Sequence, residues 1–136
     1  MSTDNRSGSW AVWVAAGAIL GLLGVAMGAA GTHALEGRLD ADALDTLETA
    51  VRFQMYHSIA LVAVGGLGYM WNSRAVSISC GLLTFGVIVF CGSLYLIALA
   101  DIGAFGAVAP VGGLSLMAGW GTLAVGAFRH FVSGKA

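Results

Sequence analysis

A ten-residue stretch, Glu48-Thr-Ala-Val-Arg-Phe-Gln-Met-Tyr-His57, holds an acid, a base, an amide, a phenol and an imidazole in an otherwise apolar chain. Glu48, Arg52 and Tyr56 share one side of a helix, because residues four apart are neighbours on a helical surface. One interpretation is a membrane-entry ion pair, in which Arg52 takes Glu48 as its partner and Tyr56 reaches the interface. The other is a site that binds a lipid head group, a quinone or a partner.

Two histidines extend this stretch into a candidate site. His57 lies inside an apolar run beside Gln54, and an imidazole there must face protein or water. His33 ends the preceding apolar run on the same side of the membrane, where it could meet His57 or Glu48. The candidate polar cluster is therefore His33, Glu48, Arg52, Gln54, Tyr56 and His57.

Catalytic and metal-binding patterns are absent from the sequence. There is no Ser/His/Asp or Cys/His arrangement, no phosphate-binding loop and no pair of catalytic carboxylates. A metal needs three or four ligands, and His130 belongs to the opposite membrane face. A haem between His33 and His57 would rest on two histidines alone, which is a weak signal. We therefore expect no enzyme, no catalytic residue, no metal and no cofactor.

Composition identifies the class of protein. Hydrophobic residues make up 58% of the 136 residues and charged residues 10%, against roughly 25% charged in a soluble domain. A net charge of −1 offers no basic surface for nucleic acid. Four runs, residues 7–35, 53–73, 75–100 and 102–128, contain no Asp, Glu, Lys or Arg. Each exceeds the ~20 residues that a helix needs to cross a bilayer.

The predicted fold is all-α, with four transmembrane helices in one antiparallel bundle that forms a single domain over residues 1–136. We expect spans near residues 10–31, 51–71, 75–99 and 110–131, and a short amphipathic acidic helix over residues 40–52. That helix either stands alone or runs straight into the second span. A cleaved signal peptide is the rival interpretation of the first run, but that run is longer than the usual ~7–15-residue hydrophobic region. Cys80 and Cys91 would lie ~16 Å apart on one helix, which excludes a disulfide between them.

Small residues recur at helical spacing in the first and last spans. Because steps of three and four keep residues on one face, these stripes let another backbone approach closely. Tight packing within the chain is the plainest interpretation; a dimer seam and a ligand groove are alternatives. The predicted packing positions are Gly17, Gly21, Gly24, Gly28, Gly31, Gly112, Gly119 and Gly126.

The basic residues predict an orientation. Four spans put both termini and the turn at residues 72–74 on one side, with Arg6, Arg74, Arg129 and Lys135. The other side holds Arg38, Arg52 and most of the acids. Because cytoplasmic loops carry the excess of Lys and Arg, both termini are predicted to be cytoplasmic.

Two segments, Gly28-Ala-Ala-Gly-Thr-His-Ala-Leu35 and Leu47-Glu-Thr-Ala-Val-Arg-Phe-Gln-Met-Tyr-His57, resemble the YgdD-type family of small inner-membrane proteins of unknown function. The resemblance covers most of the chain. Family members often have phenylalanine in the first segment, where this chain has alanines and Thr32. The resemblance implies a four-helix protein of the bacterial inner membrane and supplies no activity, cofactor or catalytic residue. It does direct attention to the candidate polar cluster.

Two classes of function follow. The first is a non-enzymatic accessory or assembly subunit, surrounded by membrane lipid, that packs through its glycine faces as a homo-oligomer or in a larger membrane complex. The second is a binder or transporter of a lipid, quinone or ion, with His33, Glu48, Arg52 and His57 as its site. Few polar residues in the last two spans leave a hydrophilic pathway poorly supplied, which favours the first class.

Overall fold

The computed structural model describes residues 9–71 and 73–134. Its long helices are α1 (Ser9–Ala30), α2 (Ala41–Met70), α3 (Arg74–Ala100) and α4 (Ala109–Ser133). A π-helical turn, η1 (Gly31–Leu35), extends α1, and a 3-10 helix, η2 (Gly103–Ala107), precedes α4. The all-α fold is confirmed. Asn72, Arg6 and Lys135, which the sequence places at one membrane face, lie outside the described residues.

Local signals account for the helix ends. Asp40 is the N-cap of α2, where its Oδ1 accepts a hydrogen bond of 2.8 Å from the Ala43 amide, as N-cap carboxylates do. Gly37 takes the connecting turn at φ +83°, a conformation that favours glycine. Asp101 ends α3 in the left-handed region at φ 53°. Pro110 occupies the first turn of α4, where its missing amide hydrogen costs nothing.

The acidic amphipathic segment at residues 40–52 is the beginning of α2 and not a separate helix. The reason is local, because residues 41–64 contain no glycine or proline to interrupt the helix. One continuous helix of 30 residues therefore carries both the acidic segment and the apolar segment that follows it.

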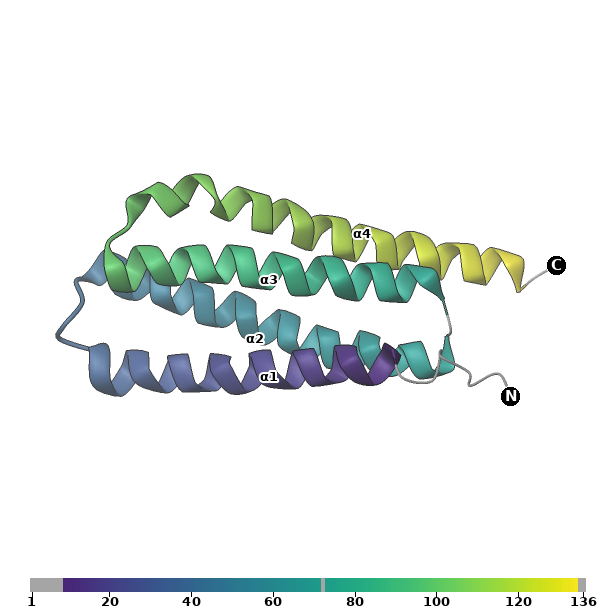
Figure 1. Cartoon of the computed structure of the whole chain (residues 1–136), viewed down its shortest axis with the longest axis horizontal. Helices are drawn as coiled ribbons and strands as arrows, with labels where there is room; N and C mark the ends of the chain where they lie inside the picture. Colours follow the sequence, from purple (N-terminus) through teal and green to yellow (C-terminus); the bar gives the residue numbers. More distant parts are fainter. Residues whose placement is uncertain (1–8, 72, 135–136) are drawn as a thin grey trace.

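The helices are arranged as a central pair with one helix on either side (Figure 1). Consecutive helices run in opposite directions, so the start of α1, the α2–α3 turn and the end of α4 share one end of the molecule. Terminal helix α1 packs mainly on α2, and α4 packs on α3. Within the described residues, no Cα of α4 comes within 8 Å of α1 or α2. The arrangement is thus open along the edges of α1 and α4.

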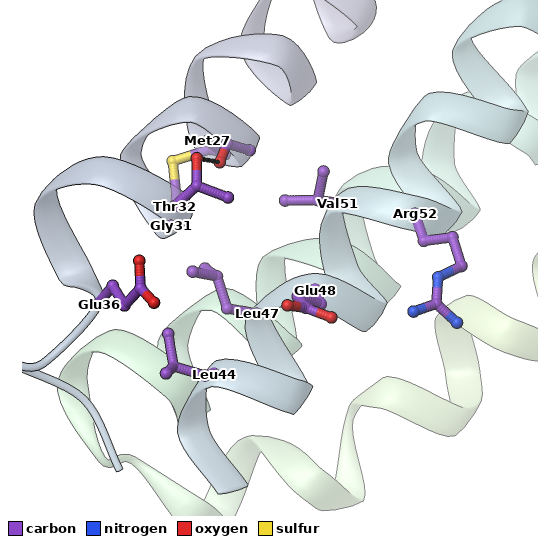
Figure 2. Close-up of a pocket in the computed structure, with 10 residues that line it drawn as sticks. Met27, Gly31, Thr32, Glu36, Leu44, Leu47, Glu48, Val51 and Arg52 are labelled. Carbon is purple, nitrogen blue, oxygen red and sulfur yellow. Dashed lines mark hydrogen bonds between the residues drawn. The ribbon is translucent and has the colours of Figure 1, made fainter. Parts of the chain in front are cut away.

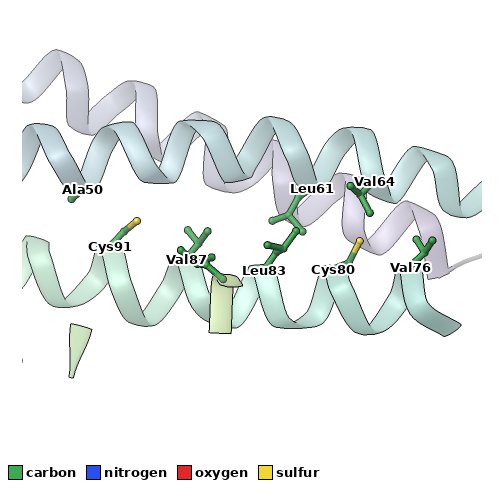
Figure 3. Close-up of a cluster of buried hydrophobic side chains, with 9 residues drawn as sticks. Ala50, Leu61, Val64, Val76, Cys80, Leu83, Val87 and Cys91 are labelled. Atoms are coloured by element: carbon green, nitrogen blue, oxygen red, sulfur yellow. The ribbon is translucent and has the colours of Figure 1, made fainter. Parts of the chain in front are cut away.

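The core lies between α2 and α3. Leu61, Leu83 and Cys80 are fully buried there (Figure 3). Leu116 on α4 belongs to the same cluster. Cys80 and Cys91 are both free thiols. Close packing of such side chains supplies the dispersion contacts that hold helices together where the solvent itself is apolar.

The glycines of α1 face α2. A Cβ atom at Gly17 would lie 2.8 Å from the Ser58 carbonyl oxygen, and one at Gly24 would lie 2.8 Å from the sulfur of Met55. Gly21 is looser, with Ser58 Cβ at 3.6 Å. Gly28 and Gly31 meet the side chains of Val51 and Leu47. The stripe lies within the chain, against α2.

The glycines of α4 face α3 in the same way. Gly112 lies directly on the backbone of Phe90, and a Cβ atom at Gly119 would lie 2.8 Å from Cδ2 of Leu83. A Cβ at Gly126 would lie 2.6 Å from the Cβ of Ala75. Both glycine faces therefore pack on neighbouring helices of the same chain.

Candidate functional site

The candidate polar cluster divides between the inside and the outside of the fold. Gln54 and His57 are buried, with 4% and 7% of their surfaces exposed. Glu48, Arg52 and Tyr56 are exposed on the other side of α2. The division follows from helical periodicity, since Gln54 and His57, three residues apart, share the face that packs against the other helices.

Gln54 joins three helices. Its Nε2 donates a hydrogen bond of 2.7 Å to the Leu20 carbonyl on α1, and its Oε1 accepts one of 2.6 Å from the Tyr95 hydroxyl on α3. The Ser58 hydroxyl donates to the backbone carbonyl of Gln54 at 2.6 Å. A buried amide is costly unless its donors and acceptors are paired, so this side chain ties α1, α2 and α3 together.

His57 joins α2 to α4. The indole N–H of Trp120 can only donate, so the hydrogen bond of 3.2 Å to His57 Nε2 makes that nitrogen an acceptor. Nδ1 then carries the proton and donates to the Phe53 carbonyl at 2.7 Å. These two bonds select the neutral imidazole with its proton on Nδ1. Both ring nitrogens are engaged, so neither is free to hold a haem iron.

The exposed part of the cluster lines a groove of about 430 Å³ between η1 and the start of α2. Glu36 and Glu48 stand on its two walls, with Arg52 farther along α2 (Figure 2). Thr32 in η1 turns its hydroxyl back to the Gly28 carbonyl at 3.2 Å. Apolar residues, Met27, Leu44, Leu47 and Val51, complete the lining.

The expected ion pair between Glu48 and Arg52 is not formed. Within residues 9–71 and 73–134, the Arg52 guanidinium lies within ion-pair distance of neither Glu36 nor Glu48. Exposed side chains at this spacing gain only about 0.3–0.5 kcal/mol from pairing. That gain is offset by the conformational entropy that two long side chains lose when they are held in one geometry. The two groups instead lie separately along the groove.

His33 does not join the others. It is exposed on η1, outside the residues that line the groove. His57 turns toward Phe53 and Trp120, on the inner side of α2. In the described part of the chain, no three His, Cys, Asp or Glu side chains gather where a metal ion could bind.

Sequence reasoning missed four polar partners. Tyr95 donates a hydrogen bond to Gln54, and Trp120 donates one to His57. Ser79 donates to the Gly119 carbonyl and Ser115 to the Leu82 carbonyl, each at 2.8 Å, across α3 and α4. The available signal was the position of Ser115 between Gly112 and Gly119, on the small face where helices exchange such bonds.

Comparison with known proteins assigns the chain to a family. The family described as "Protein of unknown function (DUF423)" matches residues 27–113, which is most of the chain. The chain belongs to the DUF423 family. The match contains Gln54, His57 and Tyr95, and it ends before Trp120. None of the solved structures matches the chain significantly.

Curated relatives agree with this assignment. A UPF0382 membrane protein of Staphylococcus saprophyticus is 38% identical over 122 residues, covering 87% of this chain and 98% of the relative. The UPF0382 membrane protein YwdK of Bacillus subtilis is 34% identical over 120 residues, covering 88% and 98%. The UPF0382 inner membrane protein YgdD of Escherichia coli is 35% identical over 119 residues, covering 82% and 86%. The resemblance to the YgdD-type family is confirmed.

Three helical stretches are long and apolar enough to cross a membrane among the described residues: 10–35, 74–100 and 103–133. They include α1, α3 and α4. Helix α2 is not among them, because Gln54, Tyr56 and His57 interrupt its apolar segment and four acids precede it. Together with the relatives' names, these stretches make this DUF423 chain a helical membrane protein.

Proposed function

We propose that the chain is a four-span protein of the bacterial inner membrane that acts without catalysis as an accessory or assembly subunit. The fourth span is α2. Residues 53–70 of that helix carry no charge and measure roughly 27 Å at helical rise, close to the hydrocarbon thickness. Its three buried polar side chains, Gln54, His57 and Ser58, are paired inside the fold, which removes most of their cost in lipid.

The observation that carries the accessory role is the contrast between the paired polar side chains inside the fold and the open apolar edges. Gln54, His57, Ser79 and Ser115 each form a hydrogen bond to a neighbouring helix, although the buried indole N–H of Trp13 has no partner among the described residues. That arrangement supports cohesion and offers no open row of polar groups for a substrate. Helices α1 and α4 meanwhile have broad exposed apolar faces, including Leu22 at 71% and Met117 at 70% exposed. A neighbouring protein helix can pack on either edge.

The assembly surface proposed here is therefore an outer edge and not a glycine face. Replacing Gly119 by Leu would force α4 away from Leu83 within the chain, so lost assembly in that variant would not separate folding from association. The informative substitutions lie on exposed positions, where a smaller side chain leaves the fold intact.

The test is native mass spectrometry of the tagged protein extracted gently from its own membrane. We expect a reproducible homo-oligomer or a larger complex. Leu114→Ala with Met117→Ala on α4, and Val12→Ala with Leu22→Ala on α1, form two matched pairs of exposed positions. One pair should reduce assembly and the other should not. His57→Ala should leave assembly intact, because His57 contacts its own chain. A monomer without partners would contradict the accessory role.

The groove between η1 and α2 supports a second candidate, a binder of a small lipid, quinone or ion. Two carboxylates and a guanidinium beside an apolar wall suit an amphiphile with a polar head. His33 and His57 have no part in this version. A molecule retained by the purified wild type and lost in Glu48→Gln with Arg52→Gln would favour it. Retention by both proteins would argue against the groove as its site.

A further inference from the structure

A second groove, of about 510 Å³, lies at the opposite end of the molecule, between the start of α3 and the end of α4. Arg74 comes from the first turn of α3, and Arg129 and His130 come from the last turns of α4. The hydroxyl-bearing residues Ser73 and Ser133 also line it. Nothing in the proposed accessory role uses these residues.

Helical spacing brings the cations to one place. Gly126 approaches Ala75 closely, so α3 and α4 meet at this level. Arg129 and His130 follow Gly126 by three and four residues, on the same face of α4. Arg74 directly precedes Ala75. The ring of His130 rests on Trp71, with the centroids 5.0 Å apart, which fixes one wall of the groove.

Among the described residues that line the groove there is no acid to balance its charge. Six of the seven acidic residues of the chain lie at residues 36–48 and at Asp101, at the far end of the helices. The seventh, Asp4, lies outside the described residues. Among the residues that the structure describes, neither Arg74 nor Arg129 has an ion-pair partner. Guanidinium groups match phosphate oxygens in geometry, and the N-terminus of α3 adds backbone dipoles that favour an anion.

One wall of the groove is apolar. Ile78 and Val125, 54% and 53% exposed, line it on the side toward the middle of the helices. The groove thus combines a cationic rim with an apolar wall that continues into the spans. Free phosphate would use only the rim, whereas a phospholipid would place its phosphate at the rim and an acyl chain along the wall.

We propose that this groove is a binding site for an anionic phospholipid, with the phosphate held by Arg74 and Arg129. Basic pockets between transmembrane helices on the cytoplasmic side are a known way to hold such head groups. The site rests on the proposed membrane insertion of α3 and α4 and not on the accessory role, so assembly and lipid binding can fail separately.

The experiment is native mass spectrometry of the full chain released from nanodiscs of phosphatidylethanolamine mixed with phosphatidylglycerol in equal parts. We expect preferential retention of phosphatidylglycerol by the wild type. In Arg74→Gln with Arg129→Gln the preference should fall about tenfold or more. Arg38→Gln, at the acidic end and outside the lining of both grooves, should keep it. Arg74→Lys with Arg129→Lys should keep most of it, because the positive charges remain although the two-pronged guanidinium geometry is lost.

Two outcomes would overturn the proposal. Equal retention of both lipids by the wild type would show that there is no anionic preference, and an equal loss in Arg38→Gln and in Arg74→Gln with Arg129→Gln would show that the groove is not the site. Inorganic phosphate in the release buffer separates the sources of the anion. Displacement of the lipid by phosphate alone would contradict the role of the apolar wall, while persistence of the lipid would support it. An unchanged thermal transition of the Arg74/Arg129 variant shows that the fold is intact.

Discussion

At the residue scale, buried polar side chains decide how this fold holds together. Gln54 binds α1 and α3 at once, and His57 accepts from Trp120 across to α4. These bonds replace the water that the interior of a membrane protein lacks. The same side chains look like a functional cluster in the sequence, because polar residues in an apolar run suit both roles. Their geometry supports the structural role.

Tyr95→Phe tests that role. The change removes the hydroxyl that donates to Gln54 Oε1 at 2.6 Å and leaves the amide oxygen without its partner. We expect a loss of about 0.6–1.7 kcal/mol in the free energy of unfolding, the range for hydrogen bonds between transmembrane helices. Denaturant-induced unfolding in mixed micelles measures it.

Tyr69→Phe is the matched control, because Tyr69 is 75% exposed on the same pair of helices. It should change the stability little. Equal effects of the two substitutions would show that the Gln54–Tyr95 bond contributes nothing particular to the fold.

At the element scale, each glycine stripe is a seam between two helices of the chain. Along α1 the seam is uneven: Gly17 lies against the backbone of α2, whereas Gly21 has only the Cβ of Ser58 at 3.6 Å. Helix spacing is set where backbones touch, since a backbone cannot turn aside as a flexible side chain can. The sequence pattern does not distinguish these glycines, whereas the structure shows which of them are packed most tightly.

Alanine substitutions should follow that ranking. In Gly17→Ala the new Cβ meets the Ser58 carbonyl oxygen and the Val62 amide nitrogen at 2.8 and 2.9 Å. We expect destabilisation by about 1–3 kcal/mol from overpacking. In Gly21→Ala the space suffices, and the higher helix propensity of alanine should stabilise the fold by up to about 1 kcal/mol.

Thermal unfolding of the two purified variants in one detergent measures the difference. A loss of stability in Gly21→Ala as large as that in Gly17→Ala would show that the α1–α2 seam is tight along its whole length, contrary to the contacts described.

At the scale of the whole molecule, charge is divided between the two ends. Arg74, Arg129 and His130 gather at the end that holds the start of α1 and the end of α4, while the acids gather around the start of α2. This division predicts an orientation in the membrane, and it supplies the cationic groove proposed to bind an anionic lipid. Both involve residues from more than one helix.

The orientation can be measured by cysteine labelling in whole cells. Cys80 and Cys91 are 0% and 2% exposed, so they give a low background. We expect Asp45→Cys to react with a membrane-impermeant maleimide from outside, because the distribution of Lys and Arg predicts that the acidic end faces away from the cytoplasm. Ser133→Cys should react only after lysis. The reverse pattern would overturn the orientation, and outside labelling of both sites would contradict the four-span arrangement.

The sequence by itself determined the features that depend on local order. Uncharged runs predict long helices, and the regular glycine spacing predicts close helix contacts. Each of these properties acts over a few residues, through backbone geometry or the length of an apolar run. The membrane class and the family resemblance followed from the same stretches.

Only the tertiary structure decided which residues meet. Tyr95 and Trp120 bind partners 41 and 63 residues away, and the ion pair expected between Glu48 and Arg52 is replaced by a groove. Periodicity shows which residues share a face but not which helix covers that face. The rotation and pairing of the helices follow from packing of the whole chain at once. That packing turns Gln54 and His57 inward, and it covers both glycine faces.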